Sequence, residues 1–409
     1  MANAFGHAMR SEWALDPAIL YLNHGTVGAP PRRVLSAQQA LRDEIELQPS
    51  KFLLREVSST RVGVPAASEL SRTRVAANAV AGFLGARGDD LVFVENVTAG
   101  INAVLRSLEF LPGDEIVITD QVYGAVAKTA QYVARLAGAH VRTAFLPETA
   151  DDPQEFVDAV AAVLTPRTRI AIVEHIAAQS ALLMPLAAIA ARCHAAGVPV
   201  LADGAHAPGA IAFDIPALGV DWYAANLHKW AWSPRSCGVL WATPERQVDL
   251  HPPVISWGLD QGFTHEFDWA GTRDPTPALA APVGLAFMQE LGLDAVRGYN
   301  HALAWEGARV LADRWGTRLT MTEPWIGTMA TVALPQAAGS TAEDAARLRD
   351  RLLFEDRIEV QLHELRGRLM TRISAQIYNE RGDIERLAAA VERAVSTTGA
   401  GREGPGVAS

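Results

Sequence analysis

Short apolar runs alternate with longer amphipathic segments between residues 90 and 245 of the chain. The apolar runs lie at 90–96, 114–120, 167–175 and 198–204, and helix-like segments at 98–108, 124–138 and 185–197 separate them. Strands that are apolar along their whole length, with helices between them, are typical of a parallel sheet covered on both faces. The pattern therefore predicts a large α/β domain built on a mainly parallel sheet.

The pattern changes after about residue 285. Long helical stretches at 278–292 and 300–316 come first, and an alternating strand at 368–379 and a helix at 383–396 follow. This order indicates a smaller α+β domain. We expect an N-terminal segment at 1–30 that packs with the small domain and the active site, a large domain at 31–284, a small domain at 285–396 and a disordered tail at 397–409.

Charge and cysteine content exclude several classes of protein. The 36 Lys and Arg are outnumbered by 46 Asp and Glu, and they form no cluster beyond short pairs. We therefore expect no nucleic-acid partner and no binding to anionic membranes. No apolar run approaches the roughly 18 residues that span a membrane, so a cytoplasmic protein is expected. Two cysteines, Cys193 and Cys237, cannot form a disulfide framework or a four-cysteine zinc site, and no metal site is predicted.

Signatures of several common chemistries are missing from the sequence. It contains no G-x-S-x-G, no H-E-x-x-H, no P-loop and no G-x-G-x-x-G after a strand, which disfavours hydrolase, zinc-protease and nucleotide-binding functions. Sheets of the predicted kind bind ligands at the carboxyl ends of their strands. The positions that follow the strands are 96–100, 120–123, 174–179, 203–206 and 226–229.

Asp203 and Lys229 are charged residues in apolar surroundings near these strand ends. Asp203 ends the run VPVLAD, where a buried carboxylate needs a cationic partner. A helix cap or a structural ion pair meets that need, and so does the protonated pyridine nitrogen of pyridoxal phosphate. Lys229 lies between His228 and Trp230 in NLHKWAW, and an apolar setting favours the neutral amine that forms a Schiff base. A solvated surface lysine is the alternative.

A phosphate group needs a site of its own. Thr98 lies at a predicted helix start in ENVTAGINAVLRSL. Its hydroxyl, the N–H groups of Ala99 and Gly100 and the helix dipole suit an anion, whereas an ordinary N-cap is the alternative for Thr98.

Two further side chains are candidates for cofactor and substrate binding. Tyr123 follows the strand at 114–120 and either lies over a cofactor ring or packs as an ordinary aromatic residue. Arg372 shares the polar face of its strand with Ser374 and Gln376. That position suits bidentate binding of a carboxylate, and a surface salt bridge is the alternative.

Seven segments follow one another along nearly the whole chain: YLNHGTVGAPPRRVL, KFLLREVSS, NVTAGINAVLRSL, VLADGAHAPGA, ANLHKWAWSP, DWAGTRD and RISAQIYN. As an ordered set they resemble the class V aminotransferase family of pyridoxal-phosphate enzymes, fold type I, and within it the isopenicillin N epimerase-like group. The resemblance implies pyridoxal 5'-phosphate as cofactor, a small amino-acid-type substrate and a homodimer with shared active sites.

The resemblance also implies roles for the cofactor-binding positions. Lys229 is similar to the lysine that bonds to the cofactor aldehyde, Asp203 to the partner of the pyridine nitrogen, and His206 to a neighbour of the ring and its 3-hydroxyl. Tyr123 resembles the residue that stacks on the ring. The implied phosphate ligands are Thr98, Ala99, Gly100 and His228, with Gly271 and Thr272 donated to the neighbouring subunit.

For the substrate, Arg372 resembles the clamp that holds the carboxylate. The other implied substrate contacts are Asn23, His24, Arg55 and Gln179. The sequence departs from many relatives at Ala178–Ala181, where those proteins carry a Ser or Thr followed by Thr-Gly. Gln179 is expected to take over the polar contact that is lost there. Substrate and reaction are therefore less transferable than cofactor binding.

The reaction depends on which bond at Cα is held ready to break. Cysteine desulfurases of this class need a mobile cysteine well after the lysine, and none follows Cys237, so persulfide chemistry is not expected. Epimerisation needs a second acid opposite Lys229, for which His24 and Tyr123 are candidates. We expect a C–S lyase, or a decarboxylating deaminase, acting on an S-cysteinyl conjugate in secondary metabolism. An isopenicillin N epimerase-type enzyme is the first alternative, and an aminotransferase or a non-catalytic pyridoxal-phosphate module are further ones.

Overall fold

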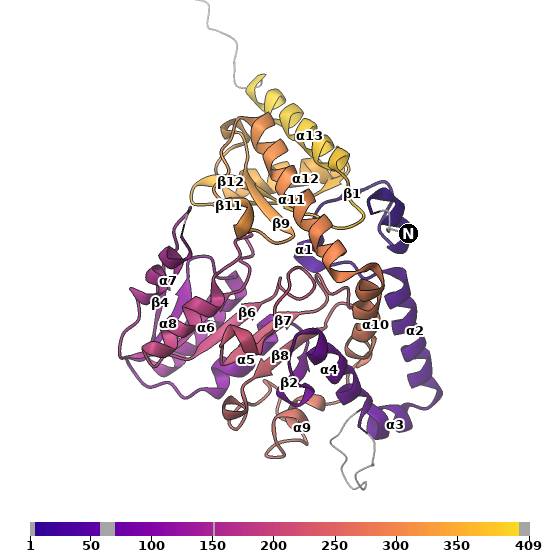
Figure 1. Cartoon of the computed structure of the whole chain (residues 1–409), viewed down its shortest axis with the longest axis vertical. Helices are drawn as coiled ribbons and strands as arrows, with labels where there is room; N and C mark the ends of the chain where they lie inside the picture. Colours follow the sequence, from indigo (N-terminus) through magenta and orange to yellow (C-terminus); the bar gives the residue numbers. More distant parts are fainter. Residues whose placement is uncertain (1–4, 58–69, 150–151, 401–409) are drawn as a thin grey trace, which may run out of the picture. The chain divides into compact units, whose positions relative to one another are not determined.

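The computed structural model describes residues 5–57, 70–149 and 152–400, with side chains up to residue 396 (Figure 1). The chain divides into two compact units. The large unit comprises Gly28–Ala178 and Leu183–Glu290, and the small unit comprises the N-terminal segment up to Val27, Gln179–Leu182 and the chain from Leu291 onward. The part of the expected tail beyond residue 400 lies outside the described residues.

A seven-stranded sheet forms the centre of the large unit, in the order β2-β8-β7-β6-β5-β3-β4. Only β8 runs antiparallel to its neighbours among these strands, and the remaining pairs are parallel. The prediction of a mainly parallel sheet is therefore confirmed. The strands are β2 (Leu91–Val94), β3 (Glu115–Thr119), β4 (His140–Ala144), β5 (Thr168–Glu174), β6 (Val200–Gly204), β7 (Trp222–Asn226) and β8 (Gly238–Ala242).

Four helices connect the parallel strands. The connections that advance toward β4 contain α5 (Val97–Ser107) and α6 (Gly124–Ala137), and those that return contain α7 (Pro153–Ala161) and α8 (Leu186–Ala195). Because crossovers between parallel strands are right-handed, the first pair covers one face of the sheet and the second pair the other. Contacts between α5 and α6, and between α7 and α8, agree with this arrangement.

The remaining elements of the large unit flank the sheet. A π-helical turn at Phe52–Val57 follows α3, and α9 contacts β2. The helices are α2 (Arg32–Leu47), α3 (Pro49–Lys51), α4 (Arg72–Phe83), α9 (Phe263–Asp268) and α10 (Thr276–Leu291), with short 3-10 turns at Gly88–Asp90, Pro216–Leu218 and Pro244–Arg246.

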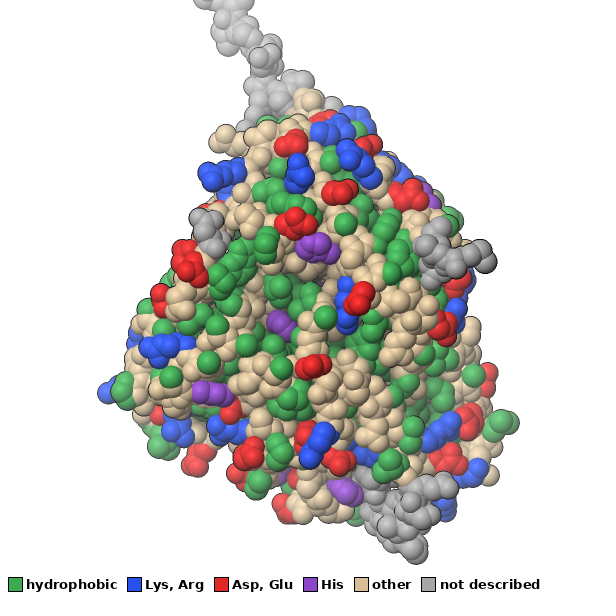
Figure 2. Space-filling model, in the orientation of Figure 1, with side chains coloured by type: hydrophobic (Ala, Val, Ile, Leu, Met, Phe, Trp, Pro, Cys, Tyr) green, Lys and Arg blue, Asp and Glu red, His purple; other side chains and the backbone are tan. Residues whose placement is uncertain are grey.

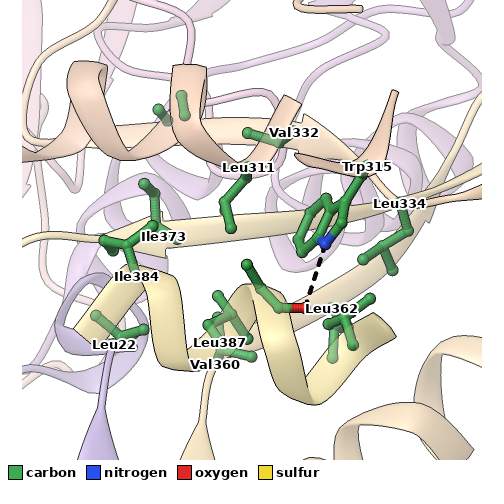
Figure 3. Close-up of a cluster of buried hydrophobic side chains, with 14 of the residues drawn as sticks. Leu22, Leu311, Trp315, Val332, Leu334, Val360, Leu362, Ile373, Ile384 and Leu387 are labelled. Atoms are coloured by element: carbon green, nitrogen blue, oxygen red, sulfur yellow. Dashed lines mark hydrogen bonds between the residues drawn. The ribbon is translucent and has the colours of Figure 1, made fainter. Parts of the chain in front are cut away.

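The small unit is built on an antiparallel sheet in the order β11-β12-β9, with a parallel pair of β1 and β10. The strands are β1 (Leu20–Tyr21), β9 (Met329–Ala333), β10 (Ile358–Glu359), β11 (Gln361–Leu365) and β12 (Arg368–Ser374). The helices are α1 (His24–Val27), α11 (Leu293–Trp315), α12 (Ala342–Phe354) and α13 (Arg381–Ala400). Figure 3 shows the apolar core between sheet and helices, where the Trp315 indole N–H donates to the Ala388 carbonyl at 3.4 Å.

Two properties of the surface and the helices bear on partners. Acidic and basic side chains are interspersed over the face shown in Figure 2. Within the described residues, no single helix has the length and apolar character to cross a membrane, although α10 and α11 meet the length and composition requirement when taken together as a bent pair.

Candidate active site

A row of polar side chains ends the strands at the carboxyl edge of the large sheet. Ile172, Leu201 and Ala224 belong to the core that packs on α5 and α6. Side chains alternate along a strand, so the residues two positions later point to the same face. Those residues are Glu174, Asp203 and Asn226. The parallel register also places Glu174 directly beside Asp203.

Asp203 is buried at the end of β6. One carboxylate oxygen, Oδ1, accepts a hydrogen bond from the Ala205 N–H at 3.0 Å. Burial raises the pKa of Asp203, and the Ala205 N–H and nearby Lys229 oppose that rise. A carboxyl group in this environment ionises most readily when a cation binds to it.

Lys229 lies in the loop between β7 and β8, close to His206. Its Nζ is 3.1 Å from His206 Nε2, and the Trp230 indole N–H donates to His206 Nδ1 at 3.4 Å. An indole N–H can only donate, so a neutral His206 carries its own proton on Nε2. The two ring nitrogens of His206 thus face Lys229 and Trp230, and Lys229 Nζ lies within hydrogen-bond distance of the imidazole.

Three glycines hold the backbone of the loop that carries Lys229. A Cβ at Gly28 would lie 1.7 Å from the His228 carbonyl oxygen. One at Gly209 would lie 2.3 Å from the Trp230 oxygen, and one at Gly284 would lie 2.8 Å from the Ala231 oxygen. These distances are shorter than any side-chain carbon tolerates, so only glycine permits the packing. The position of Lys229 is therefore fixed by chain segments far apart in sequence.

The start of α5 forms a candidate anion site that differs in detail from the sequence prediction. Asn96 is the N-cap, and its side chain accepts from the Ala99 N–H at 3.0 Å, while the Gly100 N–H donates to the Asn96 carbonyl at 3.1 Å. The backbone donors of Ala99 and Gly100 are thus engaged within the helix start. Thr98 keeps its N–H and hydroxyl without a partner among the described residues and lines a cavity of about 380 Å³.

The other predicted cofactor residues lie in the large unit with varied exposure. His228 Nδ1 donates to the Cys237 carbonyl at 2.9 Å, and burial lowers the pKa of His228 to about 4. Tyr123 precedes α6 and is 54% exposed. Gly271 and Thr272 lie in the loop before α10, and Thr272 is exposed. Arg55 is exposed in the π-helical turn and donates to the Ser50 carbonyl.

Glu174 is a buried carboxyl group that the sequence argument did not assign. Thr119 Oγ1 donates to Glu174 Oε2 at 2.8 Å, and Oε1 has no hydrogen-bond partner among the described residues. Burial, together with neighbouring Asp203 and Asp120, raises the pKa of Glu174 to about 8. Glu174 is therefore protonated at neutral pH. Its place at the end of the apolar run at 167–175 is a signal that the sequence does contain, whereas its position beside Asp203 follows only from the strand register.

Arg372 is the centre of a hydrogen-bonded network in the small unit. The guanidinium Nη2 donates to Thr26 Oγ1 at 2.9 Å, and Thr26 Oγ1 in turn donates to Asn23 Oδ1. The Asn23 amide donates to Glu359 Oε1 at 2.7 Å. Burial lowers the pKa of Arg372 to about 10. The sequence argument assigned Asn23 and His24 in the same segment but not Thr26.

Two other predicted substrate contacts have defined places in the small unit. His24 is completely buried, and its Nδ1 is 2.9 Å from the Tyr378 hydroxyl. Gln179 has an exposed side chain, and its carbonyl accepts from Thr331 Oγ1 at 2.7 Å. The structure thus groups Arg372, Asn23, His24 and Gln179 in the small unit, and Lys229, Asp203, His206 and His228 in the large one.

Comparison with known proteins identifies relatives along nearly the whole length of the chain. The family model "Aminotransferase class-V" matches residues 51–387. Isopenicillin N epimerase of Streptomyces clavuligerus is 33% identical over 96% of this chain and 99% of its own length. L-cysteine desulfhydrase of Arabidopsis thaliana is 30% identical over 91% and 87%. The solved structure of the cystine C–S lyase C-DES with cysteine persulfide has the same fold, with a TM-score of 0.74, 21% identity and coverage of 91% and 97%. The chain belongs to the aminotransferase class-V family of pyridoxal-phosphate-dependent enzymes.

Proposed function

We propose that the chain is a C–S lyase that cleaves an S-cysteinyl conjugate by β-elimination. The observation that carries the proposal is the pairing, within one unit, of the Lys229 amine beside His206 with the buried carboxyl group of Asp203. A base and a carboxylate partner for a pyridinium are the protein groups that proton removal from Cα requires.

The residues of the large unit fit pyridoxal phosphate. The Lys229 amine suits the aldehyde, and Asp203 suits the pyridine nitrogen because a bound cation offsets the burial that raises its pKa. Thr98 supplies a hydroxyl and a backbone N–H at a helix start, which suit the phosphate. His206 and His228 would lie among these ligands. When bound, the cofactor accepts electrons from the bond that breaks at Cα.

The roles proposed for the protein groups are few. Lys229 Nζ removes the proton from substrate Cα, and Arg372 binds the substrate carboxylate. The sulfur then leaves Cβ with the electron pair of the C–S bond and takes up a proton, and water completes the conversion to pyruvate, ammonia and a thiol. The glycine contacts at Gly28, Gly209 and Gly284 keep Lys229 in place during this step.

Elimination is favoured over epimerisation by the surroundings of one candidate acid. Epimerisation needs a second group that delivers a proton opposite Lys229. His24, a candidate for that role, is completely buried with its Nδ1 next to Tyr378. An epimerase remains the second candidate because the chain is 33% identical to isopenicillin N epimerase over nearly its whole length.

The cysteines favour a lyase over a desulfurase. Both are buried, and burial raises the pKa of Cys193 to about 11 and that of Cys237 to about 12. A thiol that stays protonated is a poor nucleophile toward sulfur. Neither cysteine is therefore proposed to take up sulfur from the substrate.

We also propose a homodimer in which Gly271 and Thr272 reach the phosphate site of the partner subunit. The exposure of Thr272 and the position of Gly271 beside a cavity of about 250 Å³ support this assignment.

Product analysis in heavy water tests the reaction. The holoenzyme is incubated with S-benzyl-L-cysteine and, separately, with isopenicillin N. We expect benzyl thiol and pyruvate in equal amounts, and a Lys229→Ala variant slower by at least the roughly 10²–10⁴-fold that a general base contributes. Intact substrate with one deuterium at Cα and mixed chirality would replace the lyase by the epimerase, and release of carbon dioxide would indicate the decarboxylating reaction.

A further inference from the structure

Glu174 and Asp203 lie side by side on the face of the large sheet that packs on α5 and α6. The parallel register pairs their Cα atoms, and neighbouring strands lie about 4.7–4.9 Å apart. Both side chains are buried, Glu174 with 2% and Asp203 with 3% exposure. Two carboxyl groups this close in a dry environment titrate as a pair, because ionisation of one disfavours ionisation of the other.

The hydrogen-bond partners of Glu174 suit the charged form of its carboxyl group. Thr119 Oγ1 donates to Glu174 Oε2 at 2.8 Å, and the Gln121 N–H donates to Thr119 Oγ1 at 3.1 Å. The backbone N–H of Glu174 itself also favours the charged form. Every partner that the described residues offer to this carboxyl group is thus a donor, as a carboxylate requires.

The neighbouring charges of the sheet nevertheless keep Glu174 protonated. Burial is the largest cause of its raised pKa of about 8, and the negative charges of Asp203 and Asp120 add to the rise. The positive charge of Lys229 acts on Asp203, where it opposes the rise in pKa that burial causes.

The helices on this face bring no cation to Glu174. Residues 97–104 of α5 are uncharged, and the basic residues of α6, Lys128 and Arg135, are exposed. The carboxyl group therefore has donors for a negative charge, but the described residues around it do not supply the positive charge that would stabilise its ionised form.

A protonated pyridine nitrogen bound at Asp203 would bring that positive charge. A cation within about 4–6 Å lowers the pKa of a carboxyl group by about 1–3. We propose that Glu174 is a positioning residue for the cofactor ring, which holds a proton in the cofactor-free protein and releases it when the ring binds at Asp203. The O–H bond of Glu174 breaks, its electron pair stays on the carboxylate, and the proton passes to solvent. The inference rests on the proposed function, because it takes Asp203 as the partner of the pyridine nitrogen.

Proton release on cofactor binding tests this role. Pyridoxal phosphate, adjusted to the working pH, is added to the cofactor-free protein in a pH-stat, and the protons released per bound cofactor are counted. The same count for Glu174→Gln removes the protons that come from the cofactor and from Lys229. At pH 7 we expect the unmodified protein to release about 0.4–0.9 proton per chain more than the variant. At pH 9.5 Glu174 is already ionised without cofactor, so the difference should fall below about 0.1.

Glu115→Gln is the matched control for loss of a buried carboxyl group. Glu115 starts β3 and so lies at the opposite edge of the sheet. Burial acts to raise its pKa, but hydrogen bonds from Thr165 and Arg142 outweigh that effect and lower it. Glu115 is therefore ionised at pH 7 with or without cofactor, and Glu115→Gln should release as many protons as the unmodified protein.

The outcomes separate this inference from the proposed function. Equal proton counts at pH 7 for the unmodified protein and Glu174→Gln would refute the role of Glu174, and so would a difference that persists at pH 9.5. If Asp203→Asn binds the cofactor as tightly as the unmodified protein, the assignment of Asp203 fails and this inference fails with it. A failed lyase assay together with the expected proton counts would overturn the proposed reaction alone. Should Glu174→Gln not fold, Glu174→Leu takes its place.

Discussion

Gly28 is the position where a single methyl group should disturb the lysine loop most directly. Gly28 has a φ of +67°, and a Cβ built there lies 1.7 Å from the His228 carbonyl oxygen and 3.0 Å from Lys229 Cα. The atoms in the way belong to the backbone, so they cannot rotate aside. In Gly28→Ala the loop must move by more than about 1 Å, or the N-terminal segment must leave it.

Two terms set the expected loss of stability. A left-handed conformation costs an L-residue about 1–2 kcal/mol, and forcing an extra carbon into a packed site costs about 1–3 kcal/mol, for a total of roughly 2–5 kcal/mol. Gly219→Ala is the matched control, because Gly219 has a φ of +65° and nothing within 4 Å of its Cβ position. The control carries only the conformational term, which leaves a difference of about 1–3 kcal/mol.

Thermal unfolding and cofactor absorbance measure the two effects together. One kcal/mol shifts the Tm of a domain of 150–250 residues by roughly 2–4 °C, so Gly28→Ala should melt several degrees below Gly219→Ala. The Gly28→Ala protein should also bind added cofactor more weakly, since Lys229 is displaced. Equal melting temperatures for the two variants, with cofactor binding unchanged in both, would refute the claim that close packing at Gly28 positions the lysine.

Three further predictions concern other parts of the two units. Glu174→Gln should stabilise the cofactor-free protein in a pH-dependent way. The pKa of Glu174 in the folded protein is raised from 4.5 to about 8, so the unmodified protein loses stability as the pH rises between these values. The variant has no ionisable group at this position and avoids the loss. The gain should be near zero at pH 4 and about 3 kcal/mol at pH 7, measured by urea unfolding, and an equal gain at both pH values would contradict it. Thr26→Val removes the hydroxyl that links Arg372 to Asn23. The variant should raise KM for a carboxylate substrate roughly 5–10-fold, with a smaller change in kcat. An unchanged KM would show that the link is dispensable. Burial raises the thiol pKa of Cys193 to about 11 and that of Cys237 to about 12. Neither cysteine should therefore react with Ellman's reagent in the native protein at pH 8, and both should react after denaturation. Rapid labelling of the native protein would show instead that the thiols are accessible.

The long apolar strands were predictable from the sequence because burial on both faces leaves a continuous hydrophobic run. β4 was not, because this edge strand alternates exposed and partly buried residues from His140 onward and has no such run. The antiparallel direction of β8 could not be predicted from its composition, because the direction of a strand follows from the length of its connection. The short stretch from Lys229 to β8 is too short for a helical crossover, and that length was the available signal.

The site residues show a similar division. Asp203 and Lys229 could be identified from the sequence because a charged side chain in an apolar segment requires a binding partner. The side chain of Asn96 accepts from the Ala99 N–H and so determines which backbone N–H groups at the start of α5 remain free. The sequence does not show this contact, because it depends on the local backbone geometry. Glu174 and Asp203 become neighbours only through the parallel register of β5 and β6, which the sequence pattern of the two strands alone did not provide.

The short excursion at Gln179–Leu182 has an evolutionary consequence. These residues leave the large unit after Ala178 and return to it at Leu183, and in between they pair with the small unit through Leu182 and Ile326 and through the Gln179 carbonyl. Three of the four residues at Ala178–Ala181, where the sequence is expected to depart from its relatives, therefore belong to the unit that carries Arg372. Under the roles proposed for Arg372 and Lys229, mutations there would alter the choice of substrate without changing the glycine contacts that hold Lys229.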